Sequence, residues 1–429
     1  RVAEALRQNG MISADFMITV PSSATILLTS RTSGELVLSF TENLDGTAIT
    51  KEDGIDPNTE TNLAAQVEIW KAGATFNDDS IITRLHSPYD SATALTEINL
   101  SELFPVKPHL PNPAHIDPGI FSTWLKGVAT DVYLEYYLRY ADKYGSPSVP
   151  EALVKSDDNY FVIHGAHSAD RDGGLSISLY ADKLHNYRNL VGVNFWKPIG
   201  DGQPDWLYIW TKSALTSCNV EWDILWDDGT TTNEPYSGTA FDLDINTVYY
   251  IRSTPLNFAF TPPSTGAIPW YINFKLLGDA GSGEVTIATI KYKAMVQTSW
   301  ERYLLFDNGL GGCESVLFYG KGKESFTAKR DVARRTRTSS FDIDEGEFVA
   351  FNAEGQKEFD LNTGWIEQWY AEHLRQLLLG DVWLVDFDNE RFVKLLCDTE
   401  SVVTSENDQQ LFSLSIKFRT AWVDKASNV

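Results

Sequence analysis

The chain has 429 residues, of which 43% are hydrophobic and 12% aromatic, and its formal net charge is −24 at pH 7. This length exceeds one ordinary core, so two to four domains are expected, and the many Trp, Tyr and Phe residues favour strands. The acidic excess argues against nucleic acid as the main ligand and against an anionic membrane surface, because both would repel it. No run of about 18 apolar residues is present, which argues against a transmembrane helix.

The three cysteines, Cys218, Cys313 and Cys397, are odd in number and far apart. They form neither a disulfide framework nor a CxxC metal motif. We expect them to be core thiols, in a chain that folds in a reducing cytoplasm.

Residues 1–145 predict a β-sandwich-like domain. Short apolar runs such as Phe16–Val20 and Glu35–Phe40 are separated by turns rich in Pro, Ser and Gly. Five prolines between Phe104 and Pro118 predict an extended segment that crosses a surface. Apolar and polar residues alternate from Val132 to Tyr140, which predicts a strand, although part of this stretch is also compatible with a helix.

Residues 146–298 predict a second β-sandwich-like domain, after a boundary at the Gly-Ser-Pro-Ser-Val-Pro stretch that starts at residue 145. Strand candidates include Leu207–Thr211, Val220–Trp226 and Trp270–Leu276. Turn signals such as Asp228-Gly229 lie between the candidates.

Residues 299–429 predict a β-barrel or sandwich module with one flanking helix. Asn and Gly between two apolar runs predict a hairpin with its turn at residues 307–312. Apolar residues recur every three or four positions over residues 364–379, which predicts an amphipathic helix with Thr363 as N-cap. A second hairpin around residue 388 and an alternating strand, Leu411–Arg419, follow. The predicted fold class is therefore mainly β: two tandem sandwich-like domains and a module closed by one helix.

A basic cluster stands out in the acidic chain. Several Lys and Arg residues lie between residues 321 and 337, and four of them are candidates for an assembly interface: Arg330, Arg334, Arg335 and Arg337. One interpretation is a solvated strand face. The functional one is a contact face for an acidic neighbour, which could be another copy of the chain.

No strong catalytic signature is present: the sequence lacks GxSxG, a Walker loop, GxGxxG after a strand and HExxH. His164 and His167 near Asp170 and Asp172 are compatible with a metal site, but the spacing is loose. Acidic turns at residues 170–173 and 342–346 resemble only fragments of calcium loops. We therefore predict no catalytic residues, no metal and no cofactor.

Five tryptophans gather between residues 196 and 226, beside acidic residues. Exposed indole rings with nearby carboxylates suit contact with sugars, and three of these residues are weak glycan-contact candidates: Trp196, Trp206 and Trp210. The alternating pattern around Trp222 and Trp226 instead favours places in a core.

The stretch from Trp300 to Gly312 resembles a sequence motif found in structural proteins of Bacteroidetes phages and prophages. The helix, the Gly380–Asp386 stretch and the final strand up to Trp422 are similar in order to distal-tail and tail-hub modules. The resemblance covers about residues 299–424. It implies a β module shared with the tail tube, assembly as a ring or trimer, and a place in the virion tail after synthesis in the host cytoplasm.

The sequence thus leads to a first hypothesis: a non-enzymatic structural component of a phage tail, in the distal tail, tail tip or baseplate. It would contact copies of itself and other tail proteins. The alternative is a surface adhesin or carbohydrate-binding protein that contacts host surface glycans, and a glycan-cleaving enzyme is supported least.

Overall fold

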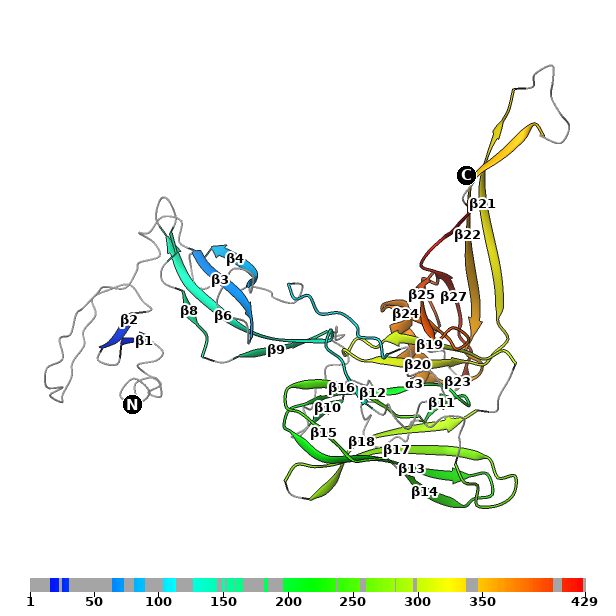
Figure 1. The fold of residues 1–429 in the computed structure, drawn as a ribbon, viewed down its shortest axis with the longest axis horizontal. Helices are drawn as coiled ribbons and strands as arrows, with labels where there is room; N and C mark the ends of the chain where they lie inside the picture. The colour runs from blue at the N-terminus through cyan, green and yellow to red at the C-terminus, as the bar shows by residue number, and fades with distance from the viewer. Residues whose placement is uncertain are drawn as a thin grey trace. The chain divides into compact units, whose positions relative to one another are not determined.

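The computed structural model describes residues 16–22, 25–30, 64–72, 81–88, 103–112, 126–144, 149–150, 153–157, 159–164, 181–183, 196–236, 238–254, 260–281, 283–295, 299–336, 346–403 and 411–426. The fold is mainly β, with several sheets, as the sequence predicted (Figure 1). Within the described ranges, helical structure is confined to α3 (Gln368–His373) and the 3-10 helix η6 (Leu374–Leu378).

Contacts between residues group the chain into two compact units. Unit 1 comprises residues 1–105 and 134–162, and unit 2 comprises residues 106–133 and 163–429. The chain therefore passes between the units three times, at residues 105/106, 133/134 and 162/163. This grouping differs from the three consecutive segments of the sequence analysis, because residues 106–133 and 163–429 share cores.

Unit 1 contains one larger sheet in the order β4-β3-β6-β7, in which β8 and β9 also pair with β6. Its strands are β3 (Ala64–Lys71), β4 (Ile81–Pro88), β6 (Tyr133–Tyr144), β7 (Val149–Pro150), β8 (Val154–Lys155) and β9 (Tyr160–Ile163). A separate antiparallel pair is formed by β1 (Phe16–Ser22) and β2 (Thr25–Ser30). The strand predicted from residue 132 onward is thus confirmed as β6, and Trp70 of β3 stacks on its Tyr137.

Unit 2 begins with a β-sandwich whose two sheets enclose a large apolar core. The outer sheet has the order β11-β18-β17-β13-β14, with β15 also on β13, and the inner sheet has the order β10-β12-β16-β5. The outer strands are β11 (Lys197–Ile199), β13 (Leu215–Trp226), β14 (Thr231–Pro235), β15 (Phe241–Leu243), β17 (Pro269–Asp279) and β18 (Glu284–Ala294). The inner strands are β5 (Lys126–Val128), β10 (Ala181–Lys183), β12 (Trp206–Thr211) and β16 (Thr247–Arg252).

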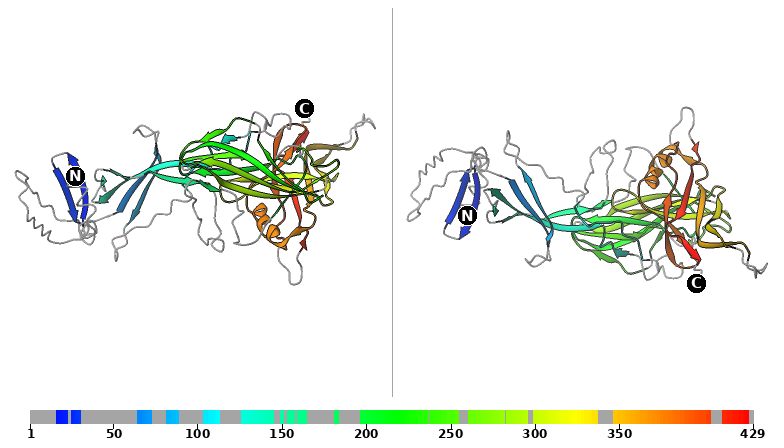
Figure 2. Two further views of the ribbon diagram at one scale, coloured as in Figure 1. Left: turned by 90° about the horizontal axis from the view of Figure 1, so that it is seen from below. Right: turned by 90° about the horizontal axis from the view of Figure 1, so that it is seen from above.

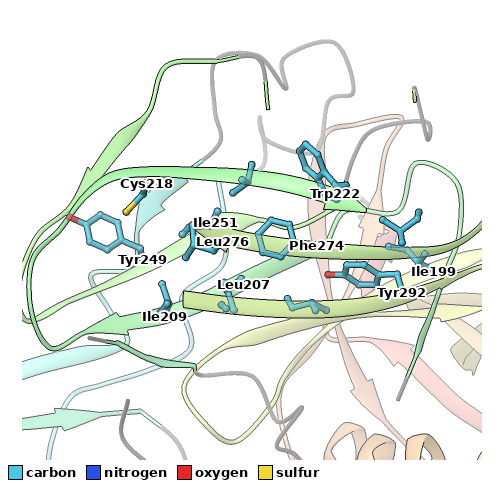
Figure 3. Packing of buried hydrophobic residues seen from close by; sticks show 14 of the residues in the cluster. Ile199, Leu207, Ile209, Cys218, Trp222, Tyr249, Ile251, Phe274, Leu276 and Tyr292 are labelled. Atoms are coloured by element: carbon cyan, nitrogen blue, oxygen red, sulfur yellow. The ribbon is translucent and has the colours of Figure 1, made fainter. Parts of the chain in front are cut away.

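Alternate residues of both sheets fill this core. Trp222, Phe274 and Tyr292 of the outer sheet pack with Leu207 and Ile251 of the inner one, as Figure 3 shows. Such interdigitation of two inner faces is what holds a sandwich together.

The third sheet of unit 2 is the C-terminal one, with the order β20-β19-β24-β25-β27-β22-β21 and β28 also on β22. Its strands are β19 (Arg302–Asp307), β20 (Cys313–Phe318), β21 (Lys323–Arg334), β22 (Phe348–Asn362), β24 (Val382–Asp386), β25 (Arg391–Cys397), β27 (Ser415–Thr420) and β28 (Asp424–Ala426). Tyr370, Leu374 and Leu377 of the helical segment pack with residues of this sheet in a second core. Figure 2 shows the helical segment, in orange, beside the strands of this sheet. A helix that closes the open face of a sheet was predicted and is observed.

The inner sheet of the sandwich is covered on both faces. Leu207 and Ile209 of β12 point into the sandwich core, whereas Trp206 and Tyr208 of the same strand pack with Leu305 of β19 and other residues of a third core. Apart from the half-buried Trp210, every residue of β12 is consequently buried.

The helix is shorter than predicted. It begins at Gln368, because Ile366 and Glu367 form β23 (Ile366–Glu367) and pair with β26 (Leu411–Phe412). Trp365 is 67% exposed instead of lining the apolar face. Thr363 is not an N-cap. Its hydroxyl accepts a hydrogen bond from the backbone N–H of Leu414 and so links this segment to the stretch between β26 and β27.

The two C-terminal hairpins and the final alternating strand are confirmed. β19 pairs with β20 around the predicted turn, and β24 pairs with β25. From Leu411 to Arg419, odd-numbered residues are exposed and even-numbered residues are buried, as the sequence pattern predicted.

Candidate assembly interface

The longest hairpin of unit 2 joins β21 and β22 and carries the basic cluster. β22 pairs with β27 at residues 358–362 and with β28 at residues 353–355. Beyond these contacts, in the described residues, β21 and β22 pair only with each other, from Asp331–Phe351 to Arg334–Phe348. We call the outer part of the hairpin, residues 326–334 of β21 with residues 348–357 of β22, the arm; Figure 1 shows the hairpin running past the other strands of the sheet.

Strand geometry divides the arm into two faces, since successive side chains point to opposite sides. Phe326, Arg330, Val332 and Arg334 lie on one face of β21, and Phe348 stands opposite Arg334. We call this set the arm face. By register, Phe326 lies on the same side of the sheet as the buried Phe359. The pairing shifts between Lys329 and Asp331, and the alternation of β21 continues this core side to Val332 and Arg334.

Three apolar side chains of the arm face are exposed. Phe326 is 58% exposed, Val332 is 57% exposed and Phe348 is 64% exposed. The ring of Phe326 lies on the backbone of Gly355, where any added Cβ would overlap it. Large exposed apolar side chains interspersed with arginine suit an interaction surface.

Three of the four predicted interface arginines lie on or beside this face, and all three are exposed. Arg334 forms an ion pair with Glu347 across the arm. Within the described residues, neither Arg330 nor Arg335 forms an ion pair. Arg337 lies outside the described residues. The charges were predicted, whereas Phe326 and Val332, which share the alternate positions of β21 with Arg330 and Arg334, were not.

The three glycan-contact candidates do not share a surface. Trp206 is only 1% exposed and its ring packs edge-on against Phe392, so it offers no free face for a sugar. The physical reason is that both faces of β12 are covered. Trp210 is half-buried, and Trp196 lies outside the sandwich core against Tyr271. Trp222 and Trp226 are core residues, as their alternation indicated.

A buried polar cluster connects the sandwich to the C-terminal sheet. The Lys197 ammonium donates to Asp205 Oδ2 at 2.8 Å, and both side chains are fully buried. Asp205 Oδ1 accepts the backbone N–H of Ser315 in β20, and Oδ2 also accepts the Tyr292 hydroxyl. Nearby, His373 Nε2 lies 3.0 Å from Glu314 Oε2. Because these charged groups are closed to solvent and paired, their arrangement suits a structural role that fixes the two sheets together.

His164 anchors the chain just after it enters unit 2 for the second time. Its Nε2 lies 2.8 Å from Asp307 Oδ2, and this hydrogen bond raises the pKa of His164 above its usual value. The backbone N–H of His164 donates to the Val132 carbonyl. His167, Asp170 and Asp172 lie outside the described residues, as does most of the acidic turn at residues 342–346. Among the residues that are described, no cluster of His, Cys, Asp and Glu is arranged to hold a metal ion.

The thiols of Cys218 and Cys313 are buried, as expected for core residues, and that of Cys397 is partly buried. Burial raises the pKa of all three, to about 11 for Cys218. Such thiols are poor nucleophiles at neutral pH. In the described part of the chain, no helix has the length and apolar character needed to cross a membrane.

Comparison with protein-family models, with curated proteins and with solved structures gave no match.

Proposed function

We propose that this protein is a structural component of a phage tail, located in the distal tail, tail tip or baseplate, where it assembles as a ring or trimer and displays β domains. The similarity of residues 299–424 to distal-tail modules motivates the proposal. The observation that carries it is the arm: a two-stranded extension whose exposed Phe, Val and Arg side chains continue the core side of a sheet.

The composition of the arm face suits a protein contact. Aromatic residues and arginine are enriched at interfaces, where they bury a large area and form directed hydrogen bonds. The acidic excess of the chain, −24 overall, makes a second copy a complementary partner for exposed arginines. β21 is also an edge strand, whose outer backbone groups can accept another strand.

Neighbouring residues on the arm provide a matched test. Arg330→Glu changes the arm face, whereas Lys329→Glu makes the same charge change on the opposite face of the same strand. We expect the unchanged protein to form a defined homo-oligomer in light scattering. Arg330→Glu should raise the concentration at which half of the protein is assembled at least about tenfold, which corresponds to about 1.4 kcal/mol. Lys329→Glu should have little effect on this concentration.

Ionic strength gives a second readout. Because part of the attraction is electrostatic, the midpoint concentration of assembly should rise between about 0.05 and about 0.5 M salt. A protein that stays monomeric at high concentration, or one that turns over a sugar or peptide, would overturn the proposal. Labelling of tail tips by an antibody against the chain, seen by electron microscopy, tests the location directly.

A further inference from the structure

The outward side of the outer sandwich sheet carries a set of side chains that the proposed function does not use. Its strands lie side by side in the order β11-β18-β17-β13. The pairing register brings together Trp196, Trp270, Tyr271, Asn273, Lys291 and Lys293. We call this set the aromatic face.

A β-bulge brings Trp270 to this side. Tyr271 pairs with Leu225, whereas the next pair joins Pro269 to Trp226, so Trp270 is an extra residue in β17. A bulge of this kind lets two successive side chains share one side of a sheet. In agreement, the rings of Trp270 and Tyr271 lie only 5.1 Å apart between centroids.

The rings form a continuous strip. The Tyr271 ring lies 4.5 Å from the ring of Trp196, and Trp270 is 49% exposed although it is large and apolar. The Lys291 ammonium lies 5.3 Å from the centre of the Trp196 ring. An exposed strip of aromatic rings beside polar groups suits a ligand with an apolar ring face and polar edges.

Carboxylate and amide side chains lie between the aromatic rings and β14 on the same side of the sheet. Asp223 accepts hydrogen bonds from Asn233 at 2.8 Å and from Asn273 at 3.5 Å, and pairs with Lys275 at 2.7 Å. These hydrogen bonds outweigh burial and lower the pKa of Asp223, so the group stays a carboxylate. Within the described residues, Asn273 Oδ1 accepts no hydrogen bond although it is buried. Because this oxygen is closed to solvent, the accessible polar group at this end of the aromatic face is the Asp223 carboxylate, whose side chain is 30% exposed.

Lysine side chains lie beside the rings of the aromatic face. Lys275 is neutralised by two carboxylates, Glu221 and Asp223. Lys291 and Lys293 stand beside the rings, and within the described residues no carboxylate pairs with Lys293. The Lys293 ammonium thus stands opposite Tyr271 in a protein of net charge −24. Charge complementarity here favours a ligand that carries a carboxylate.

We propose that the aromatic face binds a glycan chain that contains acidic sugars. The C–H face of a sugar ring would stack on Trp270 and Tyr271, its carboxylate would lie near Lys291 and Lys293, and a hydroxyl of the next sugar would reach Asp223. Adjacent outward residues of a strand are about 7 Å apart, so these groups extend over at least two sugar rings. The proposal is independent of assembly through the arm.

Binding of the full-length protein to a glycan array rich in uronic and sialic acids is the first measurement. Calorimetry with an array hit, or with oligogalacturonate and its methyl ester, then gives affinities with and without the carboxylates. We expect Trp270→Ala to weaken binding of the acidic glycan at least about tenfold. Lys293→Gln should weaken binding of the acidic form several-fold and leave binding of the ester unchanged.

Trp365→Ala is the control, because Trp365 is an exposed tryptophan just before β23, outside the outer sandwich sheet, and its replacement should leave affinity unchanged. Since Trp270 projects into solvent, its replacement should preserve the thermal unfolding midpoint. The proposal is wrong if no glycan on the array binds, if Trp270→Ala binds as tightly as the unchanged protein, or if the ester binds as well as the acid. A change in oligomeric state on Trp270→Ala without glycan binding would identify the face as a protein contact and would also overturn it.

Discussion

His164 illustrates how one titratable side chain ties the stability of unit 2 to pH. Its side chain is 24% exposed, and the carboxylate of Asp307 holds its charged form in place. Asp381 also favours the charge, whereas burial opposes it, and the net effect is a raised pKa. A histidine whose pKa is higher in the folded protein contributes stability that is complete below the unfolded pKa of about 6.5. That contribution disappears as pH rises through the raised pKa.

We therefore predict that His164→Gln lowers the free energy of unfolding most at acidic pH and least at alkaline pH. Urea unfolding of both proteins from about pH 5 to about pH 9 measures the difference. His109→Gln is the control with the opposite sign, because burial lowers the pKa of His109 in spite of Asp131. If the loss of unfolding free energy caused by His164→Gln grew as pH rises, the assigned contact between His164 and Asp307 would be contradicted.

The local residue patterns of the C-terminal block translated well into structure, because they depend only on neighbours along the strand. The strict alternation from Leu411 to Arg419 fixed which side chains are buried. The burial of the tryptophans of β12 was harder to predict from the sequence. The continuous apolar run of this strand is typical of a strand covered on both faces, yet the sequence does not reveal which element covers the second face.

At the scale of elements, the turn between β19 and β20 shapes the site where His164 is held. Gly311 has φ +96°, a conformation that favours glycine, and a Cβ there would overlap the carbonyl oxygen of His164 and the side chain of Ile163. The turn and the segment at His164 therefore fit together only without a side chain at this position.

Gly311→Ala is expected to destabilise unit 2 by more than about 2 kcal/mol, since it combines backbone strain with steric overlap. Gly229→Ala separates the two causes, because Gly229 has φ +83° but open space around it. This control should cost about 1 kcal/mol. Equal shifts of the urea midpoint in the two variants would show that the contact with His164 contributes nothing.

The helix and the arm show two limits of prediction from sequence. Helical periodicity extended over residues 364–379, but Ile366 pairs with Phe412, so the first residues of this stretch form a strand instead of a helical turn. For the arm, the charges were noticed and the apolar alternation was not, because a face without a covering element looks the same in sequence as a buried one. The aromatic face depended on a bulge and on pairing across four strands, which a single sequence does not specify.

At the scale of the whole molecule, unit 2 has layers that cannot be separated without exposing apolar surface. A chain that starts at residue 299 would lose the inner sheet and expose Leu305, Cys313 and Trp383. It would also lose Asp205, the acceptor for the backbone N–H of Ser315. We predict that this fragment aggregates or binds a hydrophobic dye far more strongly than the full-length protein. A monodisperse fragment that melts at the temperature of the intact chain would show that the C-terminal module folds alone.

The three passages of the chain between units 1 and 2 have a mechanical consequence. On the unit 2 side, the backbone N–H of Lys107 donates to Asp131 and that of His164 donates to Val132, so all three passages are fastened to one another. A pulling force on unit 1 would thus reach unit 2 through three segments of the chain, and hydrogen bonds within unit 2 join these segments to one another.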